Sequence, residues 1–494
     1  MKFNVWILFI AFIISCSSPT IENNSILAKV GSRTITKQDF IRRAEYTLRP
    51  DYCRNSNYIH KKIILNSLIA EKLFALESEK SNSELFDNPN FKSFVQGRKE
   101  QAMRQIHYVE EFYNQTKPNS RALTAAYKMS GRTVDLTYLN MPDLNSTERL
   151  LEIITNGVSL DSAYSAIWRN EHPPQRQLNW FDRESQEIHK SVFRSEIKKG
   201  DIIGPMVTDE KTYLLIQING WTDRPAMAES EKTQRMLDVR ERLKENEAKK
   251  QYKSWVSTIM SGKQLELNPD VFPAYAERVK EYYLQSDSVK QSKFNVAIWD
   301  DPEFDFTSDL TETKHPEKLD ETNILFKIDG NTTTIKSFHN QLQSHPLVFR
   351  KKKMNRAAFP QQLRLAIADL VRDIEIKKYC YEKGYGTYPS VILNEQLWSD
   401  AYLARDYRHS IIESEKIKDS NPEYYASALN PIVDSLQAVY SKIIELNMNN
   451  FESIELTSVD MTVSQKGVPY PIMVPAFPII TTDNILNFGR RINP

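Results

Sequence analysis

Two stretches of the chain share one pattern of apolar and polar positions, and they align without a gap. They are ILAKVGSRTITKQDF at residues 26–40 and ILFKIDGNTTTIKSF at residues 324–338. In each, a short apolar strand leads to a glycine turn, a second short strand and the start of a helix. The pattern therefore predicts two copies of a module made of a β-hairpin and a helix.

A longer amphipathic helix follows each copy, in residues 61–82 and 363–386. Apolar residues recur at helical spacing in both, as Ile64, Leu68, Leu73 and Leu76 and as Ile367, Val371 and Ile374. The same spacing predicts that Glu71, Lys72, Arg372 and Asp373 face solvent. Further on, residues 240–268 and 436–457 are each predicted to combine a long helix with a short terminal strand, and we expect each pair to close the module that precedes it.

The segment 133–223 interrupts the first module. Its pattern predicts a strand in TVDLTYLNM, a helix in SLDSAYSAIWRN, a short helix and a turn, and a final strand in YLLIQI. An insert of this size has room for a small domain of its own.

These stretches resemble a known family. VGSRTITKQDF and LNSLIAEKLFALESEK are similar to the opening of the periplasmic chaperone and isomerase family typified by SurA and PrsA. The insert resembles a parvulin-type (rotamase) peptidyl-prolyl isomerase domain, through RQLNWF and through a block that keeps Val192, Phe193, Gly200, Gly204, Pro205 and Val207. The resemblance implies an α+β fold: helical chaperone modules with short β-hairpins, plus an inserted α/β domain with a four-stranded antiparallel sheet and helices.

The expected organisation follows the chain in order. It comprises a signal peptide (1–15), a lipidated tether (16–25), an N-terminal helical module (26–132), the parvulin-like domain (133–223), a closing helix and strand of the first module (224–270), a linker or helical segment (271–320), a second helical module (321–460) and a proline-rich tail (461–494). Four prolines among apolar residues in VPYPIMVPAFPIITTDN exclude a helix there. We expect most of this tail to be packed, along an edge strand or over an apolar groove of the second module.

The insert departs from the family where the resemblance places catalysis. The family's first histidine has no counterpart in the strand 134–139, and Leu214 stands in place of the second. Weak polar candidates for an active isomerase are Tyr138, Thr137 and Tyr213. His172 and His189 lie where the family has no histidine, and we expect them in loops or on the surface.

Prolyl isomerisation needs no nucleophile, because its barrier of ~18–20 kcal/mol comes from amide resonance. A domain that has lost its catalytic histidines can therefore still hold an extended polypeptide in an apolar cleft. Its expected lining is Trp180, Phe181, Ile188, Phe193, Met206 and Leu214. The alternative for each of these residues is ordinary core packing, and it is favoured for Trp180 and Phe193.

The N-terminus predicts export. MKFNVWILFIAFIISCSS has one basic residue and an apolar run too short to span a bilayer, which is typical of a signal peptide. Its end resembles a bacterial lipobox with Cys16 as the lipidated residue, and an ordinary signal peptide with a chance cysteine is the alternative. Two cysteines remain, Cys53 and Cys380, and we expect two buried free thiols rather than a disulfide.

Composition excludes several classes of function. Lys and Arg number 65 and Asp and Glu 64, so no global charge attracts nucleic acid. No GxGxxG, GxxxxGK[ST], GxSxG, HExxH or CxxC motif occurs, so we expect no nucleotide, no metal and no cofactor.

Three hypotheses for function remain. The first is a lipoprotein chaperone that holds unfolded or nascent envelope proteins, anchored by its N-terminal lipid to the outer membrane on the periplasmic side. The second is an active peptidyl-prolyl cis-trans isomerase, and the third is a structural lipoprotein that docks in an envelope complex. A broad apolar concave face would favour the chaperone. A polar pocket at Tyr138 and Tyr213 would favour the isomerase, and a flat, well-packed insert with one apolar patch would favour the docking lipoprotein.

Overall fold

The structure is a computed structural model that describes residues 26–168, 172–182, 184–208, 212–286, 288–289, 319–351, 354–415, 421–456 and 472–492. The fold is α+β with several small sheets, as predicted. The chain divides into two compact units: unit 1 comprises Met1–Val109 and Ser254–Pro494, and unit 2 comprises Glu110–Lys253. The expected signal peptide, the tether with Cys16, and residues 290–318 of the expected linker lie outside the described residues.

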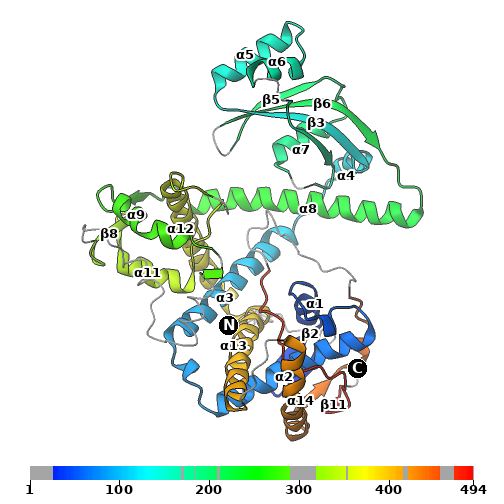
Figure 1. Ribbon diagram of the computed structural model, residues 1–494, viewed down its shortest axis with the longest axis vertical. Helices are drawn as coiled ribbons and strands as arrows, with labels where there is room; N and C mark the ends of the chain where they lie inside the picture. The colour runs from blue at the N-terminus through cyan, green and yellow to red at the C-terminus, as the bar shows by residue number, and fades with distance from the viewer. Residues whose placement is uncertain are drawn as a thin grey trace, which may run out of the picture. The chain divides into compact units, whose positions relative to one another are not determined.

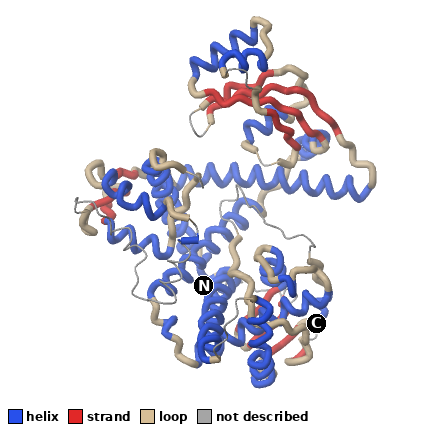
Figure 2. Tube along the Cα trace, in the orientation of Figure 1, coloured by secondary structure: helices blue, strands red, loops and turns tan. Residues whose placement is uncertain are grey.

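Unit 1 is mostly helical and contains two hairpins (Figures 1 and 2). Its first part contains β1 (Ile26–Val30), β2 (Arg33–Thr36), α1 (Lys37–Glu45), α2 (Tyr58–Lys80) and α3 (Pro89–Tyr108). After unit 2 come β7 (Leu265–Leu267), α9 (Phe272–Tyr283), β8 (Ile324–Ile328), β9 (Asn331–Thr334), α11 (Ile335–Ser344), α12 (Phe359–Glu382), α13 (Pro389–Ser414), α14 (Pro422–Val439), β10 (Ile444–Leu446), α15 (Met448–Glu452) and β11 (Arg490–Arg491). Both predicted hairpin-helix modules are present.

Both hairpins end in a capped helix. The Thr36 hydroxyl accepts a hydrogen bond from the backbone N–H of Asp39, and the Asp39 carboxylate accepts one from the backbone N–H of Thr36. At the second hairpin Thr334 accepts a hydrogen bond from the N–H of Ser337. These caps satisfy N–H groups that a helix leaves without intrahelical partners, so each helix starts where the sequence pattern predicts.

The strands that close the two hairpins are exchanged relative to the expectation. β1 pairs antiparallel with β10, so the first hairpin is closed by a strand more than 400 residues away. β8 pairs antiparallel with β7, so the second hairpin is closed by the strand that was expected to close the first. The sequences of β7 (Leu-Glu-Leu) and β10 (Ile-Glu-Leu) are nearly the same, so local pattern alone cannot assign the partner.

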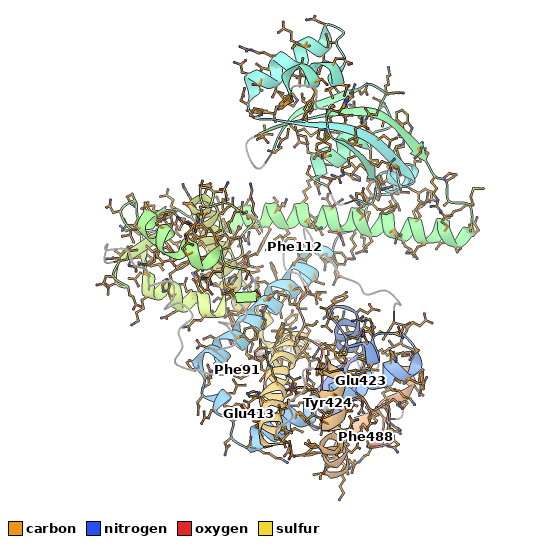
Figure 3. All side chains as sticks on the ribbon, viewed as in Figure 1. Phe91, Phe112, Glu413, Glu423, Tyr424 and Phe488 are labelled. Atoms are coloured by element: carbon orange, nitrogen blue, oxygen red, sulfur yellow. The ribbon has the colours of Figure 1, made fainter. Side chains whose placement is uncertain are left out.

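The first sheet has the order β11-β10-β1-β2, and the second has the order β7-β8-β9. β11 extends the first sheet in parallel with β10. Its residues belong to the tail, whose described part, 472–492, is packed as predicted. Phe477, Ile480 and Leu486 are buried in cores formed with α2, α13, α14 and the first hairpin, and Phe488 packs beside them (Figure 3).

The central part of α2 is buried on all sides, which corrects one prediction. Glu71 and Lys72 were expected to face solvent, but they are 1% and 2% exposed. Asp373 on α12 is also buried, while the Arg372 side chain remains about one-third exposed. The error arose because α2 is apolar around its whole circumference, and such a helix is enclosed by its neighbours.

Unit 2 contains a four-stranded antiparallel sheet with the order β4-β3-β6-β5. Its elements are α4 (Ser120–Met129), β3 (Arg132–Met141), α5 (Leu144–Thr155), α6 (Leu160–Ile167), β4 (Gln175–Asn179), α7 (Gln186–Val192), β5 (Ile202–Val207), β6 (Tyr213–Asp223) and α8 (Glu229–Ile259), whose last turns belong to unit 1. Figure 1 shows α5 and α6 on one side of the sheet and α4 and α7 on the other.

Each face of this sheet has its own core. One core joins Val134, Leu136, Ile216 and Ile218 to Val192 and Phe193 at α7 and to Val239 of α8. The opposite core joins Leu139, Met141 and Leu215 to Leu150 of α5 and Leu160 of α6. Alternate residues of one strand therefore enter different cores.

Two further expectations can be compared with the structure. Cys53 and Cys380 are buried free thiols, as predicted, and burial raises the pKa of each to about 12. In the part of the chain that the structure describes, no helix is long and apolar enough to cross a bilayer.

Candidate functional site

The six residues predicted to line an apolar cleft in unit 2 are mostly core residues. Trp180, Phe193 and Met206 are buried, and Ile188 and Leu214 are partly buried against the same core. Phe181 is the exception, with 39% of its surface exposed. The favoured alternative of core packing is therefore confirmed for Trp180 and Phe193, and these six residues do not line a common open cleft.

The three polar candidates do not converge. In the β3–β6 pairing Tyr138 lies opposite Ile216, whereas Thr137 lies opposite Gln217 and Tyr213 opposite Met141. Since neighbouring residues of a strand point to opposite faces, Tyr138 is on the α7 face while Thr137 and Tyr213 are on the α5–α6 face. Thr137 and Tyr213 are also four residue pairs apart, roughly 13 Å along the strands.

Thr137 has a structural partner. Its side chain is buried, and its hydroxyl accepts a hydrogen bond of 2.8 Å from Asn219 Nδ2. Tyr138 is 37% exposed at the opposite face. A single pocket that contains both Tyr138 and Tyr213, which would have favoured the isomerase hypothesis, is therefore incompatible with this sheet.

His189 on α7 is more enclosed than predicted. Its Nε2 lies 2.8 Å from the Trp180 carbonyl oxygen, and its ring contacts those of Trp180 and Phe193 with centroids 5.3 and 4.8 Å away. Burial lowers the pKa of His189, although the bond to the Trp180 carbonyl opposes this effect. His172 is on the surface, as predicted, and lies 3.0 Å from an Asp161 carboxylate oxygen.

Large apolar side chains are exposed on unit 2. Tyr138 and Phe181 are accompanied by a set from α5, the loops and strand ends, and α8: Leu144, Ile153, Val158, Val207, Met227 and Leu237. Exposed apolar groups of this kind offer contact area to a partner polypeptide but no proton-transfer chemistry.

Unit 1 contains a cavity that the sequence gave no reason to expect. It has a volume of about 460 Å³ and lies between α13 and the extended residues 475–480, which we call the strap. The residues of α13 that line it are Trp398, Ala401, Tyr402, Ala404, Arg405 and Arg408. Glu71 of α2 is also part of the lining. The residues of α13 recur every three or four positions, so they share one helix face.

Glu71 connects the cavity to a buried network of charges. Arg43 binds both Glu71 carboxylate oxygens, at 3.1 and 2.7 Å. Lys72 lies 3.6 Å from Glu71 and 3.0 Å from Asp400, and Arg33 Nε donates to Asp400 at 2.8 Å. The charge of Glu71 is therefore already compensated by its protein partners.

Sequence reasoning missed this cavity because its walls are about 70 residues apart along the chain. A signal was nevertheless present in α13, where Trp398, Ala401 and Tyr402 form an apolar stripe that continues into Arg405 and Arg408. A helix face that changes from aromatic to cationic is unusual for simple core packing.

The comparisons and the search for a metal site give no further guide. Within the described ranges, no cluster of His, Cys, Asp and Glu side chains has the arrangement needed to hold a metal ion. The chain matches no model of a known protein family and no curated protein.

Proposed function

We propose that the protein is a chaperone that holds unfolded or nascent envelope proteins and is lipid-anchored through Cys16 at the outer membrane, facing the periplasm. The likeness of its hairpin modules to the SurA and PrsA family, and of its insert to parvulin-type domains, motivates this proposal. In this proposal, the parvulin-like domain provides a binding surface but has no efficient isomerase activity.

The distribution of side chains in unit 2 is the observation that supports binding over catalysis. The polar candidates are divided between the two faces of the sheet, whereas large apolar side chains such as Tyr138, Phe181 and Val207 are exposed. Weak contact with extended, apolar polypeptide segments requires only such exposed groups, and release needs no nucleotide.

The first test compares two activities of the chain from Ser17 onward. We expect it to suppress the aggregation of an unfolded outer-membrane protein. In a protease-coupled assay it should leave proline isomerisation at its uncatalysed rate, which takes tens of seconds. A rate enhancement that falls in Tyr138→Phe would restore the isomerase hypothesis, and absence of both activities would favour a docking lipoprotein.

A second test assigns the activity to unit 2. The triple variant Val207→Ser, Met227→Ser, Leu237→Ser removes the most exposed large apolar groups among the described residues of unit 2, so we expect weaker suppression with little change in unfolding. The matched control replaces three exposed residues of unit 1, Leu48, Val348 and Val439, by serine. Equal loss in both triple variants would argue against a binding surface on unit 2.

A further inference from the structure

We infer that the cavity between α13 and the strap in unit 1 binds a small amphipathic carboxylate, a molecule with an apolar body and one anionic group. This site concerns a small molecule, whereas the proposed function concerns polypeptides. The inference does not depend on that function.

The walls of the cavity are fixed by hydrogen bonds and by packing of the strap. Arg43 donates a 2.7 Å hydrogen bond to the carbonyl oxygen of Ala476, and Arg408 donates one of 3.1 Å to that of Ile479. Phe477 and Ile480 of the strap are buried in adjacent cores. The strap is therefore held at both ends of the cavity, and the site is formed before any ligand arrives.

The aromatic wall is also held in place. Trp398 packs edge-on against Phe94 with ring centroids 5.5 Å apart, and the Arg98 guanidinium lies 4.7 Å from the Trp398 ring centroid. Tyr402 contacts the same Phe94 ring at 4.8 Å. Together with the side chains of the strap, this wall accommodates an apolar body, and the volume of about 460 Å³ is within the range of small-molecule sites.

The charge of the lining selects an anion. Arg405 and Arg408 are three residues apart on one face of α13, and both contribute to the cavity. Burial and the like charge of Arg405 lower the pKa of Arg408. Glu71 does not offset them, because Arg43 and Lys72 already surround its carboxylate.

A carboxylate at this end of the cavity accepts charge-assisted hydrogen bonds from the guanidinium groups that line it. Arg405 is exposed, so the charged end of the cavity is open to water. The apolar body of the ligand then lies against Trp398 and Tyr402 while its anionic group stays near the opening. A doubly charged, fully polar anion does not fit, because the rest of the lining is mainly apolar.

The test uses a matched pair of probes on the full-length chain. 4-Phenylbutyrate and 4-phenylbutan-1-ol have the same apolar body and differ in charge, and isothermal titration calorimetry measures both. We expect the acid to bind and the alcohol to bind about tenfold more weakly, as is typical when a hydrogen bond to a charged group is lost. No binding of the acid, or equal binding of both probes, would overturn the inference.

Three variants locate the site. Arg405→Gln and Arg408→Gln are each expected to weaken binding of the acid by about tenfold and to leave the alcohol unaffected. Arg364→Gln, at an exposed position of α12, is the control and should change neither. Ala401→Trp fills the cavity and should abolish binding of both probes.

If Arg408→Gln unfolds the protein because the strap is released, Arg405→Gln and Ala401→Trp decide the question. Acid binding that persists unchanged in the Ala401→Trp variant shows that the acid binds elsewhere, and the assignment is then wrong.

Discussion

The two hairpins of unit 1 begin from the same pattern of apolar and polar positions, with six of fifteen residues identical, and are completed in different surroundings. The first belongs to a sheet of four strands whose neighbours include the buried charges Arg33, Arg43 and Glu71. The second belongs to a sheet that has three strands in the part of the chain that is described, and its nearby cation, Lys263, is partly exposed and pairs with Asp329 and Glu375. Similar hairpins thus differ in how strongly they depend on the rest of the chain.

The comparison shows that the repeated pattern specifies each hairpin, whereas the stability of the hairpin depends on segments that are distant in sequence. The first sheet recruits β10, β11 and the strap from the last fifty residues of the chain. The second sheet uses a strand that shortly precedes α9. Substitutions at matched positions in the two sheets measure this asymmetry.

The largest effect is expected for Arg43→Ala. Its guanidinium is fully buried and binds both Glu71 and the strap carbonyl of Ala476, so its removal leaves a buried carboxylate poorly compensated. We expect a loss of about 3–5 kcal/mol in the free energy of unfolding, measured by urea denaturation. The corresponding change beside the second sheet, Lys263→Ala, should cost only about 0–1 kcal/mol. Comparable losses would remove the proposed asymmetry.

A somewhat smaller effect is expected for the closing strands. Leu446 of β10 is fully buried, whereas Leu267 of β7 is partly buried. Leu446→Ala should cost about 3 kcal/mol and Leu267→Ala about 1 kcal/mol, since the cost of a cavity depends on burial. Hydrogen exchange should report faster opening of β1 in the first variant and of β8 in the second. Faster exchange of β8 in Leu446→Ala would contradict the observed pairing.

Two glycines extend the comparison to backbone geometry. Gly489 has φ +75°, and an added Cβ would lie 2.7 Å from the Ile444 carbonyl oxygen. Gly330, in the turn of the second hairpin, has φ +81° with no atom within 4 Å of such a Cβ. Gly330→Ala should therefore cost about 1–2 kcal/mol from the positive φ alone, and Gly489→Ala about 2–3 kcal/mol because of the added clash. Thermal unfolding of the two variants measures the difference.

The smallest effect is a pH dependence of folding stability near the second hairpin, and it arises from Asp373 of α12. Burial alone would raise the pKa of Asp373 on α12, but its bond to His345 and the charges of Arg372 and Arg104 lower it to about 2. Because the folded-state pKa lies below the usual 3.8, the stabilisation is complete above about pH 4 and is lost as the pH falls towards 2. It amounts to no more than about 2.5 kcal/mol.

Acid titration of Asp373→Asn checks this expectation. The variant should be less stable than the parent at neutral pH and should lose less stability between pH 4 and 2. Glu413→Gln, which changes an exposed carboxylate at the end of α13, is the control and should follow the parent (Figure 3). An unchanged acid dependence in Asp373→Asn would show that other carboxylates determine it.

Much of the fold of unit 1 could be predicted because each element is encoded locally. The hairpins, α2, α12 and the pair formed by α8 and β7 lie where periodicity and turn residues indicate. The prediction for residues 436–457 was wrong, because α14 ends at Val439 and the strand β10 (Ile444–Leu446) is followed by α15 instead of ending the segment. The strand partners could not be predicted, because Leu265–Leu267 and Ile444–Leu446 offer the same side chains to either hairpin. The burial of Glu71 and Lys72 depends on helices and a strap that are distant in sequence.

The candidate site was less predictable than the fold. Strand alternation alone places Tyr138 and Thr137 on opposite faces, so this part of the error was avoidable. The position of Tyr213 required the register between β3 and β6, which is a tertiary property. The aromatic-to-cationic face of α13 is visible in the sequence, but the cavity at Arg405 and Arg408 also needs the strap as its second wall, and nothing within α13 predicts that wall.

The pairing of β1 with β10 and of β10 with β11 has a consequence for the order in which the chain is made. During synthesis of the chain, the sheet of the first hairpin lacks β10 until Leu446 has been added and lacks β11 until Arg491 has been added. The second hairpin finds its closing strand already made. The first hairpin therefore keeps an unpaired edge while more than 400 further residues are synthesised, whereas the second hairpin can pair at once.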